Sequence, residues 1–190
     1  MAEQLVIERA RKVKALVLDG DGVIFTGHVL EGMDGPLAKT RHHCDGQGIS
    51  LIRAAGMPVA CMTGESGKHA VFLEKLVEKW NSLPTVKEGR WHPVPVFTGA
   101  ERSRKVDIIK SWLAEFGFSL EECAAMGDDL TDYDLIRAVG LAAAPAQAED
   151  IIKRYAHYIA PRRGGHGAVR DFANLILEAK GIDVTALALR

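Results

Sequence analysis

The sequence predicts a doubly wound α/β fold, in which helices cover both faces of a parallel sheet. Short apolar runs alternate along the chain with longer segments of helical period, as strands joined by helical crossovers do. The run ALVLDGDGVIFTG at 15–27 ends in two aspartates, and a later apolar run is followed by Asp128 and Asp129. Polar residues directly after strands are typical of a ligand site at the carboxyl edge of such a sheet.

Length and charge favour one domain over residues 1–190, with neither a nucleic-acid nor a membrane partner. The chain is 47% hydrophobic, enough for a sizeable core, and its formal net charge is -1, too small to attract a polyanion. No segment resembles a signal peptide or a membrane span. The three cysteines lie far apart without CxxC spacing, which excludes a disulfide framework and a structural zinc site. We therefore expect a cytoplasmic protein.

The expected elements follow from the apolar runs and from the helical periods between them. The predicted strands are 13–18, 59–62, 94–98, 124–126, 140–143 and 157–159. The predicted helices are 48–55, 68–80, 102–116, 132–139, 147–155 and 168–180.

Two segments interrupt this alternation. Residues 25–44 are rich in glycine and charge and suit a small β-hairpin flap, with the His42, His43 and Cys44 segment as one of its strands. Residues 81–95 hold three prolines without a clear period and form an irregular excursion.

Three groups of polar residues converge on one edge of the predicted sheet. Asp19 and Asp21 follow the first strand, Thr63 and Gly64 follow the second, and Asp128 and Asp129 follow the fourth. Carboxylates gathered there repel one another unless a hard cation lies among them. Magnesium takes oxygen ligands and commonly binds substrate phosphate, so the arrangement favours phosphoryl transfer.

Several of these motifs have a simpler explanation or suggest another kind of site. A single Asp-x-Asp after a strand can be a solvated turn, although a second acidic cluster argues against that. An EF-hand loop fails because Leu30 stands where its glutamate is required. Gly64 to Lys68 is not a P-loop, because Met62 replaces its first glycine and His69 its Ser or Thr. Adjacent His42, His43 and Cys44 on one strand do not all face one metal ion.

The motifs together resemble the haloacid dehalogenase superfamily. Four motifs occur in the expected order: DGDGV at 19–23, Thr63, Lys105 and GDDLTD at 127–132. Within the superfamily, the chain resembles the small-cap group of KDO 8-phosphate and nonulosonate phosphatases. The local matches are Lys39, CDGQGI at 44–49, GDDLTDYDL at 127–135 and GGHGAVRDF at 164–172.

This resemblance implies roles for individual residues. Asp19 is the expected nucleophile, which forms an aspartyl-phosphate, and Asp21 the expected general acid. Thr63 and Lys105 hold the phosphoryl oxygens. Mg2+ is bound by Asp19, Asp128 and the backbone carbonyl of Asp21, and Asp129 and Asp132 lie behind these ligands or orient Lys105.

The resemblance also implies how the substrate and other subunits bind. Gly64, Lys39, Asp45 and Arg170 are the expected substrate-binding residues, and Arg170 can offer a bidentate fork to a carboxylate. Residues 181–190 are expected to pack on a neighbouring subunit of a homo-oligomer, a tetramer by resemblance. Departures from the group lie where a sugar is recognised: Phe25, Glu65 where relatives often have arginine, and Arg41 with its two following histidines.

The expected function is a Mg2+-dependent phosphatase for a small phosphate monoester, an acidic sugar phosphate such as KDO 8-phosphate or a nonulosonate 9-phosphate. Two alternatives remain open at this stage. One is a catalytically silent oligomerisation module like the related domain of some sugar-nucleotide synthetases, although such a module has no need of the full motif set. The other is a phosphotransferase or phosphomutase, which shares the nucleophile and passes phosphate to a sugar.

Overall fold

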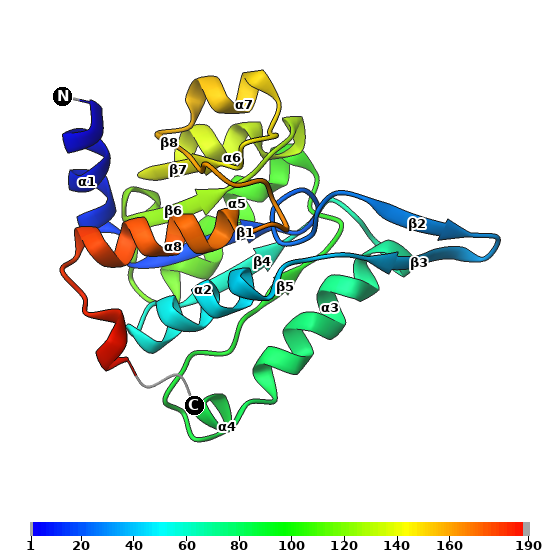
Figure 1. The fold of residues 1–190 in the computed structure, drawn as a ribbon, viewed down its shortest axis with the longest axis horizontal. Helices are drawn as coiled ribbons and strands as arrows, with labels where there is room; N and C mark the ends of the chain where they lie inside the picture. The colour runs from blue at the N-terminus through cyan, green and yellow to red at the C-terminus, as the bar shows by residue number, and fades with distance from the viewer. Residues whose placement is uncertain (1, 188–190) are drawn as a thin grey trace.

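A six-stranded sheet forms the centre of the computed structural model, which describes residues 2–187 (Figure 1). Its strands, in spatial order, are β5 (Val96–Phe97), β4 (Val59–Met62), β1 (Ala15–Asp19), β6 (Cys123–Met126), β7 (Leu141–Ala144) and β8 (Tyr158–Ile159). All neighbouring strands pair in parallel. The predicted fold class is confirmed, and β1 is the strand from which the chain winds in both directions.

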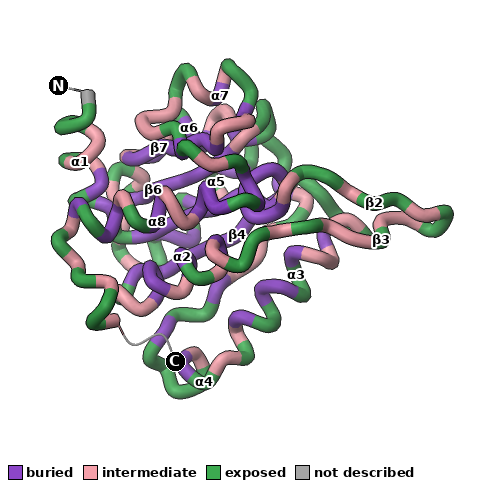
Figure 2. The backbone as a smooth tube through the Cα atoms, viewed as in Figure 1, coloured by how far each residue is buried: buried purple, intermediate pink, exposed green. Residues whose placement is uncertain are grey.

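Helices cover both faces of the sheet, and the alternation of side chains along β1 explains why. Leu16 and Leu18 pack in one core cluster, whereas Ala15 and Val17 pack in the other, because successive side chains of a strand point to opposite faces. The first cluster includes residues of α1 (Ala2–Lys12), α2 (His43–Ala54), α3 (Gly67–Asn81) and α8 (Ala168–Ala179). The second includes residues of α5 (Arg102–Ala114), α6 (Tyr133–Ala138) and α7 (Asp150–Tyr155). β1 is therefore buried along its whole length (Figure 2).

The predicted flap is an antiparallel hairpin of β2 (Val29–Gly32) and β3 (Gly35–Lys39), which projects away from the sheet in Figure 1. Two lysine contacts join it to α3. Lys39 Nζ donates to the carbonyl of His69 at 3.1 Å, and Lys68 Nζ donates to the carbonyl of Asp34 at 2.6 Å. The hairpin is thus joined to α3 both at its base, through Lys39, and at its turn, through Asp34.

The segment from 81 to 95 is ordered by specific hydrogen bonds rather than by a regular period. It contains the short helix α4 (Pro84–Lys87). The Asn81 side chain pairs with both backbone groups of Val94 at 2.8 Å, and Arg53 donates to the carbonyl of His92 at 3.0 Å. These long-range contacts explain why the local sequence did not predict its shape.

Three helices differ from the prediction. The helix expected at 48–55 begins at His43, so His42 and Cys44 are not in a flap strand. His42 caps this helix, because its Nδ1 accepts from the backbone N–H of Cys44 at 3.1 Å. The sequence did not predict α1 as an element, and the helix expected at 147–155 begins only at Asp150.

Short 3-10 helices occupy Leu120–Glu122, Leu130–Asp132 and Val184–Ala186. The last of these belongs to the C-terminal tail, where Ile182, Val184 and Leu187 pack partly buried against the chain's own core. Contact of this tail with a neighbouring subunit stays a prediction, and residues 188–190 lie outside the described residues. Within residues 2–187, no helix has both the length and the apolar character needed to cross a membrane.

Candidate active site

The parallel register brings the predicted motifs to one edge of the sheet. Asp19, the last residue of β1, pairs in register with Met62 of β4, and Leu18 pairs with Met126 of β6. Thr63 and Asp128 follow these two partners by one and two residues. A cleft of about 260 Å³ lies at this edge. The predicted residues that line it are Asp19, Asp21, Thr63, Gly64, Asp128 and Asp129.

Lys105 is the buried cation of the site, and it joins Asp19 to Asp132. Its Nζ lies 2.7 Å from Asp19 Oδ1 and 2.6 Å from Asp132 Oδ1, and the lysine is 0% exposed. Burial tends to lower the pKa of Lys105, but the two carboxylates outweigh it and raise that pKa, so the lysine is charged. The sequence alone left an ordinary surface lysine open, which the structure excludes.

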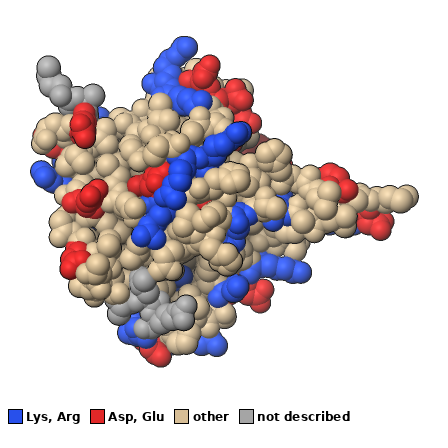
Figure 3. Space-filling model, in the orientation of Figure 1, with Lys and Arg blue, Asp and Glu red and all other residues tan. Residues whose placement is uncertain are grey.

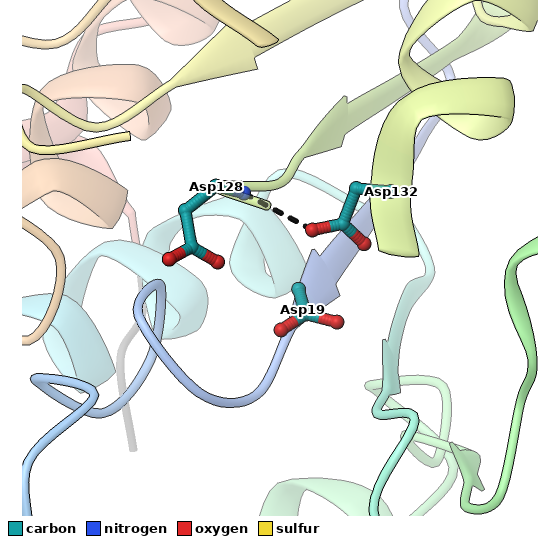
Figure 4. Close-up of side chains that lie close together, drawn as sticks. All are labelled: Asp19, Asp128 and Asp132. Atoms are coloured by element: carbon teal, nitrogen blue, oxygen red, sulfur yellow. Dashed lines mark hydrogen bonds between the residues drawn. The ribbon is translucent and has the colours of Figure 1, made fainter. Parts of the chain in front are cut away.

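Asp132 supports the site from behind. Besides the contact with Lys105, its Oδ2 accepts the backbone N–H of Asp128 at 3.0 Å (Figure 4). Both carboxylate oxygens of Asp132 are therefore engaged. Of its two predicted roles, behind the metal ligands or orienting Lys105, the structure favours the second. Asp129 does not share this role: it is exposed, and its Oδ1 accepts from the backbone N–H of Leu130 at 2.6 Å.

Asp19 and Asp128 have carboxylate oxygens that are not engaged in hydrogen bonds among the described residues. Carboxylate oxygens of Asp19, Asp128 and Asp132 lie within 4.8 Å of one another (Figure 4). Asp19 uses only Oδ1 for Lys105, and no hydrogen bond engages the Asp128 carboxylate among the described residues. Burial and then the Asp132 charge raise the pKa of Asp19 well above its usual value, against the opposing charge of Lys105. Burial, Asp132 and Asp129 raise the pKa of Asp128 to about 7. This cluster lacks the positive charge it needs to stay fully ionised, and a hard divalent cation fits that donor set.

Asp21 faces the flap. Lys39 Nζ lies 2.7 Å from Asp21 Oδ2, and the Lys39 side chain is only 2% exposed. Asp21 Oδ1 is buried without a hydrogen-bond partner. One oxygen is therefore held by the hairpin, while the other is left for a proton or a ligand.

The loop after β1 is fitted closely to the other motifs. Gly22 has a φ of 79°, and a Cβ on it would overlap the Asp128 carboxylate, so only glycine fits there. Gln147 holds the same loop: its Nε2 donates to the carbonyl of Gly22 at 2.7 Å, and its Oε1 accepts the N–H of Gly164 at 2.8 Å. Sequence reasoning missed Gln147, although its position just beyond the strand at 141–144 was a usable signal.

Two predicted substrate-binding residues are not brought to the cleft. Asp45 is 1% exposed, and its two oxygens accept the backbone N–H groups of Gly167 and Arg170 at 2.9 and 3.1 Å. Asp45 therefore stabilises the start of α8, where unpaired helical N–H groups attract a carboxylate. Arg170 donates from Nε to Asn174 Oδ1 at 2.8 Å and does not line the acidic cleft. The structure corrects the assignment of Asp45, whereas substrate binding by Arg170 stays a prediction.

Metal binding at this cluster is expected to depend steeply on pH. A metal binds the Asp128 carboxylate in competition with its proton, so Mg2+ affinity should fall by about tenfold per pH unit below about pH 7 and level off above it. Without metal, the raised pKa means that the folded state loses stability as the pH rises through the range from 3.8 to about 7. Calorimetric titration of Mg2+ into the protein at several pH values measures the first effect. Asp128→Asn should weaken Mg2+ binding and remove the part of the stability change that Asp128 contributes, while the part from Asp19 stays. A pH-independent Mg2+ affinity in the unaltered protein would contradict the expectation.

Comparison with known proteins was made by family model, by sequence and by structure. Residues 51–170 match the model of haloacid dehalogenase-like hydrolases. The 3-deoxy-D-manno-octulosonate 8-phosphate phosphatase of Yersinia pestis is 33% identical over 175 residues, which are 92% of this chain and 85% of the relative. Its counterpart in Escherichia coli K12 is 32% identical over 176 residues, 93% of this chain and 85% of the relative.

Solved structures show the same fold. A probable YrbI family phosphatase from Pseudomonas syringae has a TM-score of 0.81 and 33% identity, with 94% of this chain and 92% of that chain covered. The 3-deoxy-D-manno-octulosonate 8-phosphate phosphatase from Moraxella catarrhalis, in complex with magnesium, phosphate and KDO, has a TM-score of 0.77 and 25% identity. That alignment covers 93% of this chain and 92% of the other.

Proposed function

Because the chain belongs to the haloacid dehalogenase-like hydrolases and is a phosphoric monoester hydrolase, we propose that it is a Mg2+-dependent phosphatase for an acidic sugar phosphate. KDO 8-phosphate and nonulosonate 9-phosphates are the candidate substrates. The observation that carries the proposal is the buried Asp19–Lys105–Asp132 arrangement at the carboxyl edge of β1. In this arrangement Lys105 binds one oxygen of Asp19, and the other oxygen is free to act at the cleft that Asp19 lines.

In the proposed reaction, Asp19 attacks phosphorus and the bond to the sugar oxygen breaks, which leaves an aspartyl-phosphate on Asp19. Asp21 gives a proton to the leaving oxygen and then takes one from the water that hydrolyses the acyl phosphate. Lys105 and Thr63 offset the charge that spreads over the phosphoryl oxygens. Thr63 is 3% exposed at the cleft wall, and its hydroxyl already accepts the N–H of Glu65 at 3.1 Å, which fixes its position.

Mg2+ is the proposed cation. Asp19, Asp128 and the backbone carbonyl of Asp21 would hold it, and it would neutralise the phosphate and the carboxylates together. Asp129 remains exposed beside this group, and Asp132 stays engaged with Lys105. The unpaired Asp19 and Asp128 oxygens and the raised pKa values support this assignment. The magnesium bound in the Moraxella catarrhalis relative supports the choice of ion.

Homo-oligomer formation is part of the proposal, with a tetramer as the state that the resemblance implies. Leu30, Met33 and Leu37 of the projecting hairpin are exposed, which is unusual for large apolar side chains on one small element. Contact between hairpins of different subunits would cover them. Light scattering of the purified protein measures the state, and a monomeric mass would contradict it.

The function is tested by phosphate release over a panel of phosphate esters, with and without Mg2+. The panel holds KDO 8-phosphate, nonulosonate 9-phosphates, hexose phosphates and p-nitrophenyl phosphate. Turnover that requires Mg2+ and is fastest on an acidic sugar phosphate is expected. Equal turnover of hexose phosphates would contradict the substrate class, and transfer of phosphate to an added sugar would indicate the phosphotransferase alternative.

A further inference from the structure

A second and larger cleft lies away from the acidic site. Its volume is about 710 Å³, and it separates one side of α2 from the end of α3 and from α4. This volume falls within the range of about 300–1,000 Å³ typical of small-molecule sites. None of the residues that line it lines the acidic cleft. We refer to it as the α2–α4 cleft.

The charges that line this cleft are all positive. Arg41 stands at the α2 wall and Lys79 at the α3 wall, and no aspartate or glutamate belongs to the lining. Neither cation makes an ion pair within residues 2–187. Arg41 is half-buried, and burial lowers the pKa of its guanidinium despite the nearby Asp45. Basic side chains gather on this part of the surface in Figure 3, over α2, α3 and α4.

One residue of the lining, Thr85, carries a buried polar group without a hydrogen-bond partner. Thr85 is 1% exposed, and its hydroxyl makes no hydrogen bond. Its backbone carbonyl, in contrast, accepts from the N–H groups of Arg90 and Trp91 at 2.9 and 3.0 Å. A buried hydroxyl without a partner costs folding free energy, and this one lies beneath the surface of the cleft.

The remaining wall is apolar and held in place. Trp80, Leu83 and Pro84 line the cleft beside Lys79. The hydrogen bonds of Asn81 with Val94 and of Arg53 with His92 fix the segment that presents them. These hydrogen bonds fix the wall of the cleft that the 81–95 segment forms.

We propose that the α2–α4 cleft binds a small organic anion that has an apolar body. Its acidic group lies between Arg41 and Lys79, and its apolar part contacts Trp80 and Leu83. The site is separate from the acidic cleft, so binding needs neither Mg2+ nor Asp19.

The test uses anilinonaphthalene sulfonate, an anion of this class whose fluorescence rises on binding, with Mg2+ and inorganic phosphate present to occupy the acidic cleft. We expect saturable binding of one probe per chain, weakened at least about fivefold by Arg41→Gln and by Lys79→Gln. Lys75→Gln, which alters an exposed lysine of the same helix outside the cleft, and Asp19→Asn should bind the probe as the unaltered protein does. Equal affinity in all variants would overturn the proposal. If Arg41→Gln changes the oligomeric mass measured by light scattering, the cleft is a subunit contact and the proposal fails.

Discussion

Asp19→Asn is expected to reduce Mg2+-dependent phosphate release by a factor on the order of 10⁴ or more, because an amide does not serve as the nucleophile. The protein should still fold, since Lys105 retains its contact with Asp132 at 2.6 Å. Removing the Asp19 charge also relieves repulsion among the three carboxylates of the cluster. Steady-state phosphate release and circular dichroism of the same preparation separate chemistry from folding.

Asp129→Asn is the matched control for this experiment. Asp129 lines the same cleft, but it is exposed and caps only its own short helix. We expect its activity to change by less than about threefold, since surface carboxylates contribute little. If Asp19→Asn kept more than about a hundredth of the activity, the aspartyl-phosphate mechanism would be wrong.

Lys105→Met should have the largest effect on stability. It leaves Asp19 and Asp132 buried against each other without a cation, and removal of one partner from a buried ion pair costs about 3–5 kcal/mol. The loss should be greatest at neutral pH and shrink in acid, because the raised pKa of Asp19 lets its carboxylate take up a proton there. Urea unfolding at several pH values measures it, and activity should fall by about 10²–10³ as a phosphoryl contact is lost.

Added Mg2+ is expected to restore part of this stability, because the ion binds Asp19 and replaces some of the missing positive charge. Lys110→Met on the exposed side of the same helix is the control, with an expected change within about 0.5 kcal/mol. A Lys105→Met protein as stable as the Lys110→Met protein would contradict the buried ion-pair network.

The positions of the motif residues bear on the alternative functions that the sequence left open. Each motif position, namely Asp19, Asp21, Thr63, Lys105 and Asp128, lies at the acidic cleft or directly behind it. A silent oligomerisation module has no physical reason to bury a lysine between two carboxylates, because that arrangement carries a desolvation cost. The arrangement therefore favours an enzyme over the silent module.

Local patterns in the sequence determined the sheet, its parallel direction and the edge that holds the site. This succeeded because period and strand ends are local properties, and parallel strands bring their carboxyl ends to one edge. Asp19, Thr63 and Asp128 were found in this way. The hairpin was found because glycine, proline and charge interrupt the helical pattern.

Tertiary structure alone decided the features that depend on partners distant in the sequence. Lys105 was ambiguous until its contacts with Asp19 and Asp132 were visible, and Asp45 was misassigned because the α8 amides that it caps lie more than a hundred residues away. The 81–95 segment takes its shape from Asn81, Arg53 and the residues they hold, not from its own propensity. Burial and charge pairing are properties of the assembled fold, so neither the α2–α4 cleft nor the unpartnered Thr85 hydroxyl could be predicted from the sequence.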